Sequence, residues 1–165
     1  MIRWQYFPRS ARPPESLSDV VRVFEEHGKK IYSAEKTLKS NAVLAIVRES
    51  LVACGFKVEA AKSRIGMPVL YGPQGNADKT FFVAAWSPSA RTVLEVEAGR
   101  AVVNYQFLKD IFEASVIDGV DYLGIAVRNK YARNDDFRSV STFLDTLYAS
   151  DRLQLNLKGI MVIGY

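Results

Sequence analysis

The spacing of apolar and polar residues along the chain changes near residue 56. Before this point, two segments carry apolar side chains at helical spacing and predict helices over 16–27 and 33–55. Gly28 and Gly55 follow these segments, as glycine commonly follows a helix. Beyond residue 56, β-branched and aromatic residues alternate with polar ones, which is typical of strands. Four strands are therefore expected, near 57–61, 67–71, 80–86 and 91–97.

The C-terminal part alternates helices with buried strands. Helices are expected over 104–117 and 137–148, and strands over 122–127 and 159–165. The first of these helices is expected to bury Phe107, Leu108, Ile111, Phe112 and Ala114 or Ser115. The order of the elements predicts an α/β fold with a mixed β-sheet flanked by helices.

The first 16 residues contain three prolines and are expected to form an N-terminal arm or an irregular packed segment. Trp4, Tyr6 and Phe7 would hold part of it against the body of the protein. A chain of 165 residues fits one domain, so residues 1–165 are interpreted as a single unit with this arm.

Composition excludes several classes of protein. With 48% hydrophobic and 24% charged residues, the chain matches an ordinary folded protein. No apolar run approaches the length of about 20 residues that a membrane span needs, and the first residues do not resemble a signal peptide. The single cysteine, Cys54, cannot form an intrachain disulfide, so a cytoplasmic location is expected. The net charge of +4 suits a polyanionic partner.

Acidic residues gather around the hairpin expected between the third and fourth strands. If Trp86 pairs with Arg91 across the turn Ser87–Ala90, Glu95 and Glu97 lie on one face of the hairpin. The same register brings Asp78 to that face. Three carboxylates on one face repel each other unless a cation lies between them.

Hard carboxylate oxygens without histidine or cysteine favour Mg²⁺ or Mn²⁺, which commonly serve phosphate chemistry. Phosphoryl transfer is therefore the leading class of reaction. The alternative is an ordinary solvated strand face whose acids pair with Lys57, Lys62 or Lys79.

These residues resemble the PD-(D/E)xK nuclease superfamily, in the variant with glutamate at the usual lysine position, as in restriction endonucleases of the BamHI and BglII kind. The resemblance covers roughly residues 40–165 and rests on the acidic strand 93–99, the helix that starts near Asn104 and the apolar strand Tyr122–Arg128. It implies a restriction-endonuclease-like sheet and duplex cleavage by a homodimer.

The resemblance also implies roles for individual residues. Asp78, Glu95 and the carbonyl of Val96 would bind the metal, and Glu97 would act on the attacking water. Glu49, on the preceding helix, would contact metal-bound water, although an exposed position on that helix is an equal alternative.

Basic residues follow the strand that ends near residue 127. Arg128, Lys130 and Arg133 could lie along a phosphate backbone, or in a solvated loop that also contains Asp135 and Asp136. Together the patterns predict a Mg²⁺- or Mn²⁺-dependent endonuclease that hydrolyses DNA, with restriction-type cleavage as one form. The alternative is a non-catalytic module on the same fold that binds nucleic acid or protein.

Overall fold

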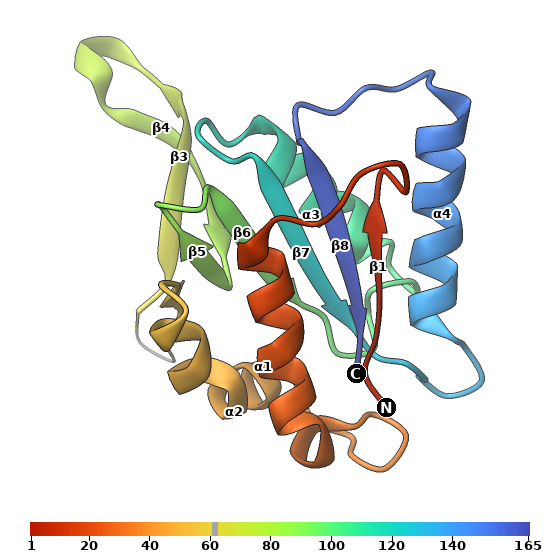
Figure 1. Ribbon diagram of the computed structural model, residues 1–165. Coiled ribbons are helices and arrows are strands. Elements are labelled where there is room, and N and C mark those ends of the chain that lie inside the picture. Colours follow the sequence, from red (N-terminus) through yellow and green to blue (C-terminus); the bar gives the residue numbers. More distant parts are fainter. Residues whose placement is uncertain (61–62) are drawn as a thin grey trace.

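The computed structural model describes residues 1–60 and 63–165 and shows an α/β fold in three layers. A six-stranded sheet in the order β1-β8-β7-β6-β5-β2 forms the middle layer. Helices α1 and α2 cover one face, and helices α3 and α4 cover the other (Figure 1). The predicted mixed sheet flanked by helices is confirmed.

The bounds of the elements follow the expected pattern with shifts at several ends. The helices are α1 (Glu15–Ile31), α2 (Ser40–Ala53), α3 (Gln106–Val116) and α4 (Asp136–Ser150). The strands of the main sheet are β1 (Arg3–Phe7), β2 (Lys57–Val58), β5 (Ala85–Ser87), β6 (Thr92–Val96), β7 (Tyr122–Val127) and β8 (Gly159–Gly164). A second, two-stranded sheet consists of β3 (Ile65–Tyr71) and β4 (Ala77–Val83).

Strand directions explain how the sheet is built. β6, β7 and β8 are parallel, and α3 and α4 supply the crossovers that parallel strands require. β1, β5 and β2 extend the sheet as antiparallel strands at its two sides. Because side chains alternate along a buried strand, Leu94 and Val96 pack toward α1 and α2, and Val93 packs toward α3 and α4.

Several predictions about the elements were wrong. The supposed arm contains β1, which pairs antiparallel with β8 over its whole length. The second helix begins at Ser40, and residues 33–39 connect it to α1. The strand expected over 57–61 is the short β2, and residue 61 lies outside the described residues, as does the possible ion-pair partner Lys62.

The β3–β4 hairpin projects from the body of the protein (Figure 1). β4 ends at Val83 and β5 starts at Ala85, so the chain changes partner around Ala84, from β3 before it to β6 after it. The expected continuous strand over 80–86 is therefore two strands in two different sheets.

Among the described residues, no helix combines the length and the apolar character needed to cross a membrane.

Candidate active site

The turn before β6 determines which residues face each other. Ser87 pairs with Thr92 and Ala85 with Leu94, so the hairpin register differs by two positions from the expected pairing of Trp86 with Arg91. Arg91 has a φ of 52° and belongs to the turn, where its N–H donates to the carbonyl of Pro88 at 3.4 Å. The prediction counted Arg91 as part of the strand.

Glu95 lies next to Ala84 in this register, at the point where β4 leaves the sheet. The N–H of Ala84 donates to Oε1 of Glu95 at 3.3 Å. Since Leu94 and Val96 pack toward α1 and α2, Glu95 faces the other layer, which contains α3.

Helix α3 brings two more carboxyl groups to this layer. Asp110 is 4% exposed and Glu113 is 9% exposed, although both are acidic. Nε2 of Gln106 donates to Oδ1 of Asp110 at 3.2 Å, and Lys109 pairs with Glu113 at 3.4 Å. Oδ2 of Asp110 is buried and has no hydrogen-bond partner among the residues that the structure describes.

The carboxyl groups influence each other's ionisation. Burial raises the pKa of Glu95 well above its usual value, and the charge of Asp110 raises this pKa further, against the opposing hydrogen bond from Ala84. Burial and the charge of Glu97 raise the pKa of Asp110 to about 7. Burial also raises the pKa of Glu97, while Lys109 and Arg100 lower it. We call Glu95, Glu97 and Asp110 the carboxylate cluster.

Glu97 sits where β6 ends, and both polar groups of its backbone are fixed. Its N–H donates to the carbonyl of Ala126 at 2.8 Å, and its carbonyl accepts a hydrogen bond from the hydroxyl of Tyr165 at 2.8 Å. Two residues later the chain turns at Gly99, whose φ of 89° suits glycine. A Cβ at Gly99 would also lie 2.5 Å from the ring of Tyr131.

Asp78 does not join the carboxylate cluster. It is exposed near the tip of the projecting hairpin, where its Cβ lies 3.8 Å from the position of a Cβ built on Gly72. Its strand β4 pairs with β3 over this stretch, so the register that would have placed it beside Gly99 does not exist.

The other predicted residues of the site occupy different places. Glu49 is exposed on α2, which covers the opposite face of the sheet from α3, so the exposed alternative holds. Val96 is the last residue of β6, and its side chain is buried toward α1 and α2.

The three basic residues after β7 have different surroundings. Arg128 is 7% exposed, donates to the carbonyl of Leu38 and lies 5.2 Å from the centre of the Tyr131 ring. Its guanidinium is therefore engaged in contacts within the protein. Lys130 and Arg133 are exposed in the loop before α4, as both interpretations of this loop require.

Asp110 and Glu113 are site residues that the sequence pattern did not predict. The apolar Leu108 and Phe112 were expected on the buried side of the helix, whereas Phe112 is 60% exposed. The available signal was the spacing of Gln106, Asp110 and Glu113 at i, i+4 and i+7, which places three polar residues on one face of a helix.

The donor chemistry of the cluster fits a hard divalent cation, because every candidate ligand is a carboxylate oxygen and Oδ2 of Asp110 lacks a partner. Within residues 1–60 and 63–165, no three acidic, histidine or cysteine side chains converge closely enough to hold a metal by themselves. Mg²⁺ commonly keeps several waters and uses one or two carboxylates, and the carboxyl groups of this layer include those of Glu95 and Asp110. No protein-family model, curated protein or solved structure matches the chain.

Proposed function

We propose that this protein is a Mg²⁺- or Mn²⁺-dependent nuclease that hydrolyses phosphodiester bonds in DNA at the carboxylate cluster. One observation carries the proposal: burial raises the pKa values of Glu95, Glu97 and Asp110, which come from β6 and its end and from α3. The charge of Glu97 also raises the pKa of Asp110, and the charge of Asp110 raises the pKa of Glu95. Buried carboxyl groups with perturbed pKa values are common in active sites.

Each residue of the cluster has a separate proposed role. Glu95 and Asp110 would hold the cation, which would polarise a phosphoryl oxygen and lower the pKa of a bound water. Glu97 would accept the proton of the attacking water, and its raised pKa makes it a better proton acceptor. The N–H of Glu97 donates to Ala126 and its carbonyl accepts from Tyr165, and these two hydrogen bonds fix the backbone that carries the carboxyl group.

The strand pattern around the cluster supports the resemblance to the PD-(D/E)xK nucleases. β6 has an antiparallel neighbour in β5 and a parallel neighbour in β7 that is reached through α3. By this resemblance, Glu97 would take the place of the usual lysine, and two copies of the protein would act together on a duplex. Asp78 is replaced by Asp110 as the second metal ligand.

The alternative is a non-catalytic module that binds nucleic acid or protein. It is favoured by the absence of three converging ligands in the described residues. The two functions differ in their need for metal, because a binding module works without it.

Cleavage of supercoiled plasmid tests the proposal. Wild type is incubated with Mg²⁺, Mn²⁺ or EDTA beside Glu95→Gln, which keeps the size of the side chain and removes its charge. Glu26→Gln, an exposed position on α1, is the matched control. We expect metal-dependent nicking by wild type and the control and none by Glu95→Gln. A folded wild type that leaves the plasmid intact with both metals would favour the binding module.

A further inference from the structure

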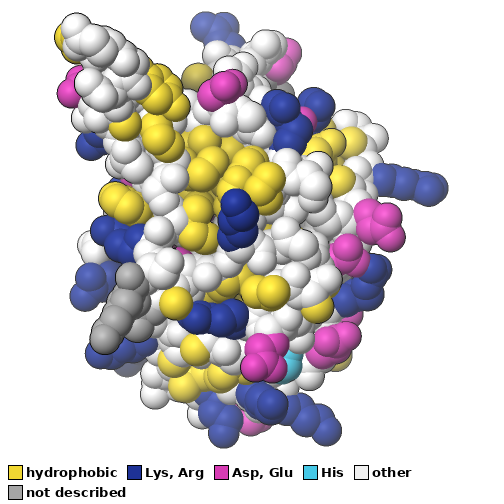
Figure 2. Space-filling view, turned by 90° about the vertical axis from the view of Figure 1, so that its left-hand side faces the viewer, with side chains coloured by type: hydrophobic (Ala, Val, Ile, Leu, Met, Phe, Trp, Pro, Cys, Tyr) yellow, Lys and Arg dark blue, Asp and Glu magenta, His cyan; other side chains and the backbone are white. Residues whose placement is uncertain are grey.

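The β3–β4 hairpin combines exposed aromatic rings with cations. Phe82 is 41% exposed and Tyr71 is 65% exposed. The guanidinium of Arg64 lies 3.8 Å from the centre of the Phe82 ring, and Nζ of Lys79 lies 5.4 Å from that of Phe81. Figure 2 shows hydrophobic side chains along the projecting hairpin and Lys and Arg side chains below it.

A pocket of about 290 Å³ lies at the base of this hairpin. Among the described residues, its polar lining consists of Asn41 and Arg48 of α2 with Glu59 and Arg64, which is two cations and one acid. Arg48 donates to the carbonyl of Glu59 at 2.5 Å, while its Nε is buried without a hydrogen-bond partner among the described residues. Arg64 connects the pocket to the hairpin because it also covers Phe82.

Ala84 lies between the pocket and the carboxylate cluster. The carbonyl of Ala84 accepts from the N–H of Glu59 at 2.8 Å, and the N–H of Ala84 donates to Glu95 at 3.3 Å. The pocket is lined by α2 and lies on that side of the sheet, whereas the side chain of Glu95 faces α3, so the two sites lie on opposite faces of the sheet.

We propose that the hairpin and the pocket at its base form a nucleic-acid-binding surface, in which Arg48 and Arg64 hold a backbone phosphate and the exposed rings contact bases. Guanidinium groups bind phosphate oxygens well, and aromatic rings beside cations are typical of surfaces that bind nucleic acid. A two-stranded ribbon also fits the major groove of a duplex. The surface goes beyond the proposed function, because the pocket lies on the α2 side of the sheet and the carboxylate cluster faces α3.

Charge distinguishes nucleic acid from a second protein copy as the partner. Between residues 63 and 83, the charged side chains are Arg64, Asp78 and Lys79, and the pocket adds Arg48. An apolar contact between two copies would need neither Arg48 and Arg64 in the pocket nor the guanidinium over the exposed Phe82 ring, whereas a phosphate backbone is bound by such cations.

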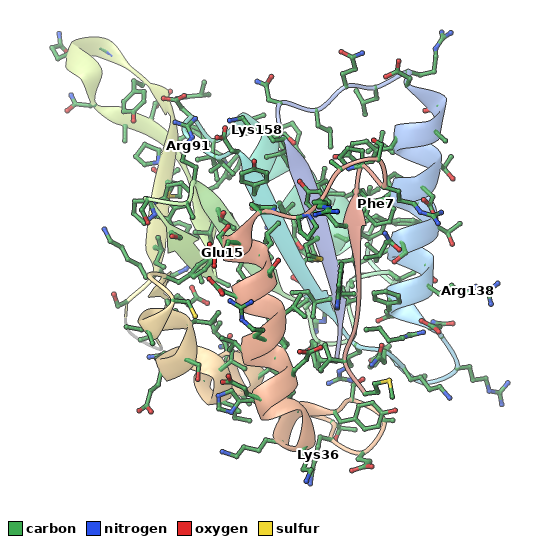
Figure 3. The ribbon with its side chains drawn as sticks, viewed as in Figure 1. Phe7, Glu15, Lys36, Arg91, Arg138 and Lys158 are labelled. Atoms are coloured by element: carbon green, nitrogen blue, oxygen red, sulfur yellow. The ribbon has the colours of Figure 1, made fainter. Side chains whose placement is uncertain are left out.

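The test is fluorescence anisotropy with a fluorescein-labelled 20-base duplex and its single strand, in EDTA so that no metal-dependent cleavage occurs. Arg64→Gln with Lys79→Gln removes two exposed cations of the surface. The control, Arg138→Gln with Arg152→Gln, removes the same charge from exposed positions away from the hairpin. Figure 3 shows Arg138 pointing outward from the α4 side of the molecule.

We expect the hairpin variant to bind about tenfold more weakly and its salt dependence, the slope of log K against log salt, to be smaller by roughly 2. Tyr71→Ala should weaken binding of the single strand more than binding of the duplex, because stacking needs unpaired bases. The control should bind like wild type, and circular dichroism should show all variants folded.

Equal binding by the hairpin variant and the control overturns the proposal, as does wild type that binds neither oligonucleotide. A hairpin variant that binds as wild type but sediments as a smaller species would instead make the hairpin a contact between copies. Hairpin-dependent binding by a wild type that cleaves no plasmid refutes only the nuclease, whereas cleavage with binding insensitive to the hairpin refutes only this surface.

Discussion

Replacing Asp110 with asparagine tests whether ionisation of the carboxylate cluster lowers the free energy of unfolding. Burial and Glu97 raise the pKa of Asp110 from 3.8 to about 7, so ionising it in the folded protein is unfavourable. Each pH unit corresponds to 1.36 kcal/mol, which gives a cost of at most about 4 kcal/mol. Asparagine removes the charge and can still accept the hydrogen bond from Gln106.

The sign of the effect follows from the direction of the shift. Because the folded-state pKa of Asp110 lies above its unfolded-state value, the folded protein binds more protons between pH 4 and pH 7. The free energy of unfolding therefore falls as pH rises through this window and stays low above it. In Asp110→Asn this fall should be smaller, and at pH 8 the variant should be more stable by about 1–4 kcal/mol.

Urea unfolding in EDTA at pH 5 and pH 8 measures this difference. A stabilisation of 1 kcal/mol corresponds to a rise of about 2–4 °C in melting temperature for a chain of this size. Added Mg²⁺ should stabilise wild type at pH 8 and leave the variant unchanged. Parallel stability curves for wild type and variant between pH 5 and pH 8 would refute the reasoning, since Asp110 would then ionise without cost.

Two further predictions concern single residues. Asp78→Asn and Glu49→Gln should retain metal-dependent plasmid cleavage, because the structure places both residues outside the carboxylate cluster; loss of cleavage in Asp78→Asn would contradict the observed strand register, and loss in Glu49→Gln would contradict its place on the opposite face of the sheet. Tyr165→Phe should lower the free energy of unfolding by about 1 kcal/mol through the lost hydrogen bond to the carbonyl of Glu97. If that bond positions Glu97, the cleavage rate at saturating Mg²⁺ should also fall while the affinity for DNA in EDTA stays that of wild type; equal losses of rate and affinity would contradict this role.

Local patterns were enough to predict most of the layers. α1, α3 and α4 have an apolar side at helical spacing, and β7 and β8 are short apolar runs between helices. These elements bury a face that can be recognised from their own residues. β1 could not be found in this way, because its partner β8 lies at the other end of the chain and prolines follow it directly.

The site was predicted only in part because its geometry depends on a turn and a change of partner. Glu95 and Glu97 were identified from their alternation on one strand, which is a local property. Asp78 was placed with them by a register that counted Arg91 as a strand residue and assumed one straight strand through Ala84. Asp110 approaches from α3, and no local pattern states which face of a helix meets which strand.

Two buried acids in this fold differ in what balances their charge. Asp136, at the start of α4, is fully buried, but the nearby charge of Arg128 opposes the effect of burial and its pKa is raised only to about 6. Asp110 lies among like charges from Glu97 and Glu113, the hydrogen bond from Gln106 and the charge of Lys109 oppose them, and its pKa still rises to about 7. Arg128 therefore opposes the effect of burial on Asp136 from within the fold, although neither carboxylate oxygen of Asp136 has a hydrogen-bond partner among the described residues. The carboxylates around Asp110 raise its pKa, so a cation from solution would stabilise its charged form. The sign of the neighbouring charges, and not the lack of a hydrogen bond, is the physical reason to look for a bound metal at Asp110 and Glu95.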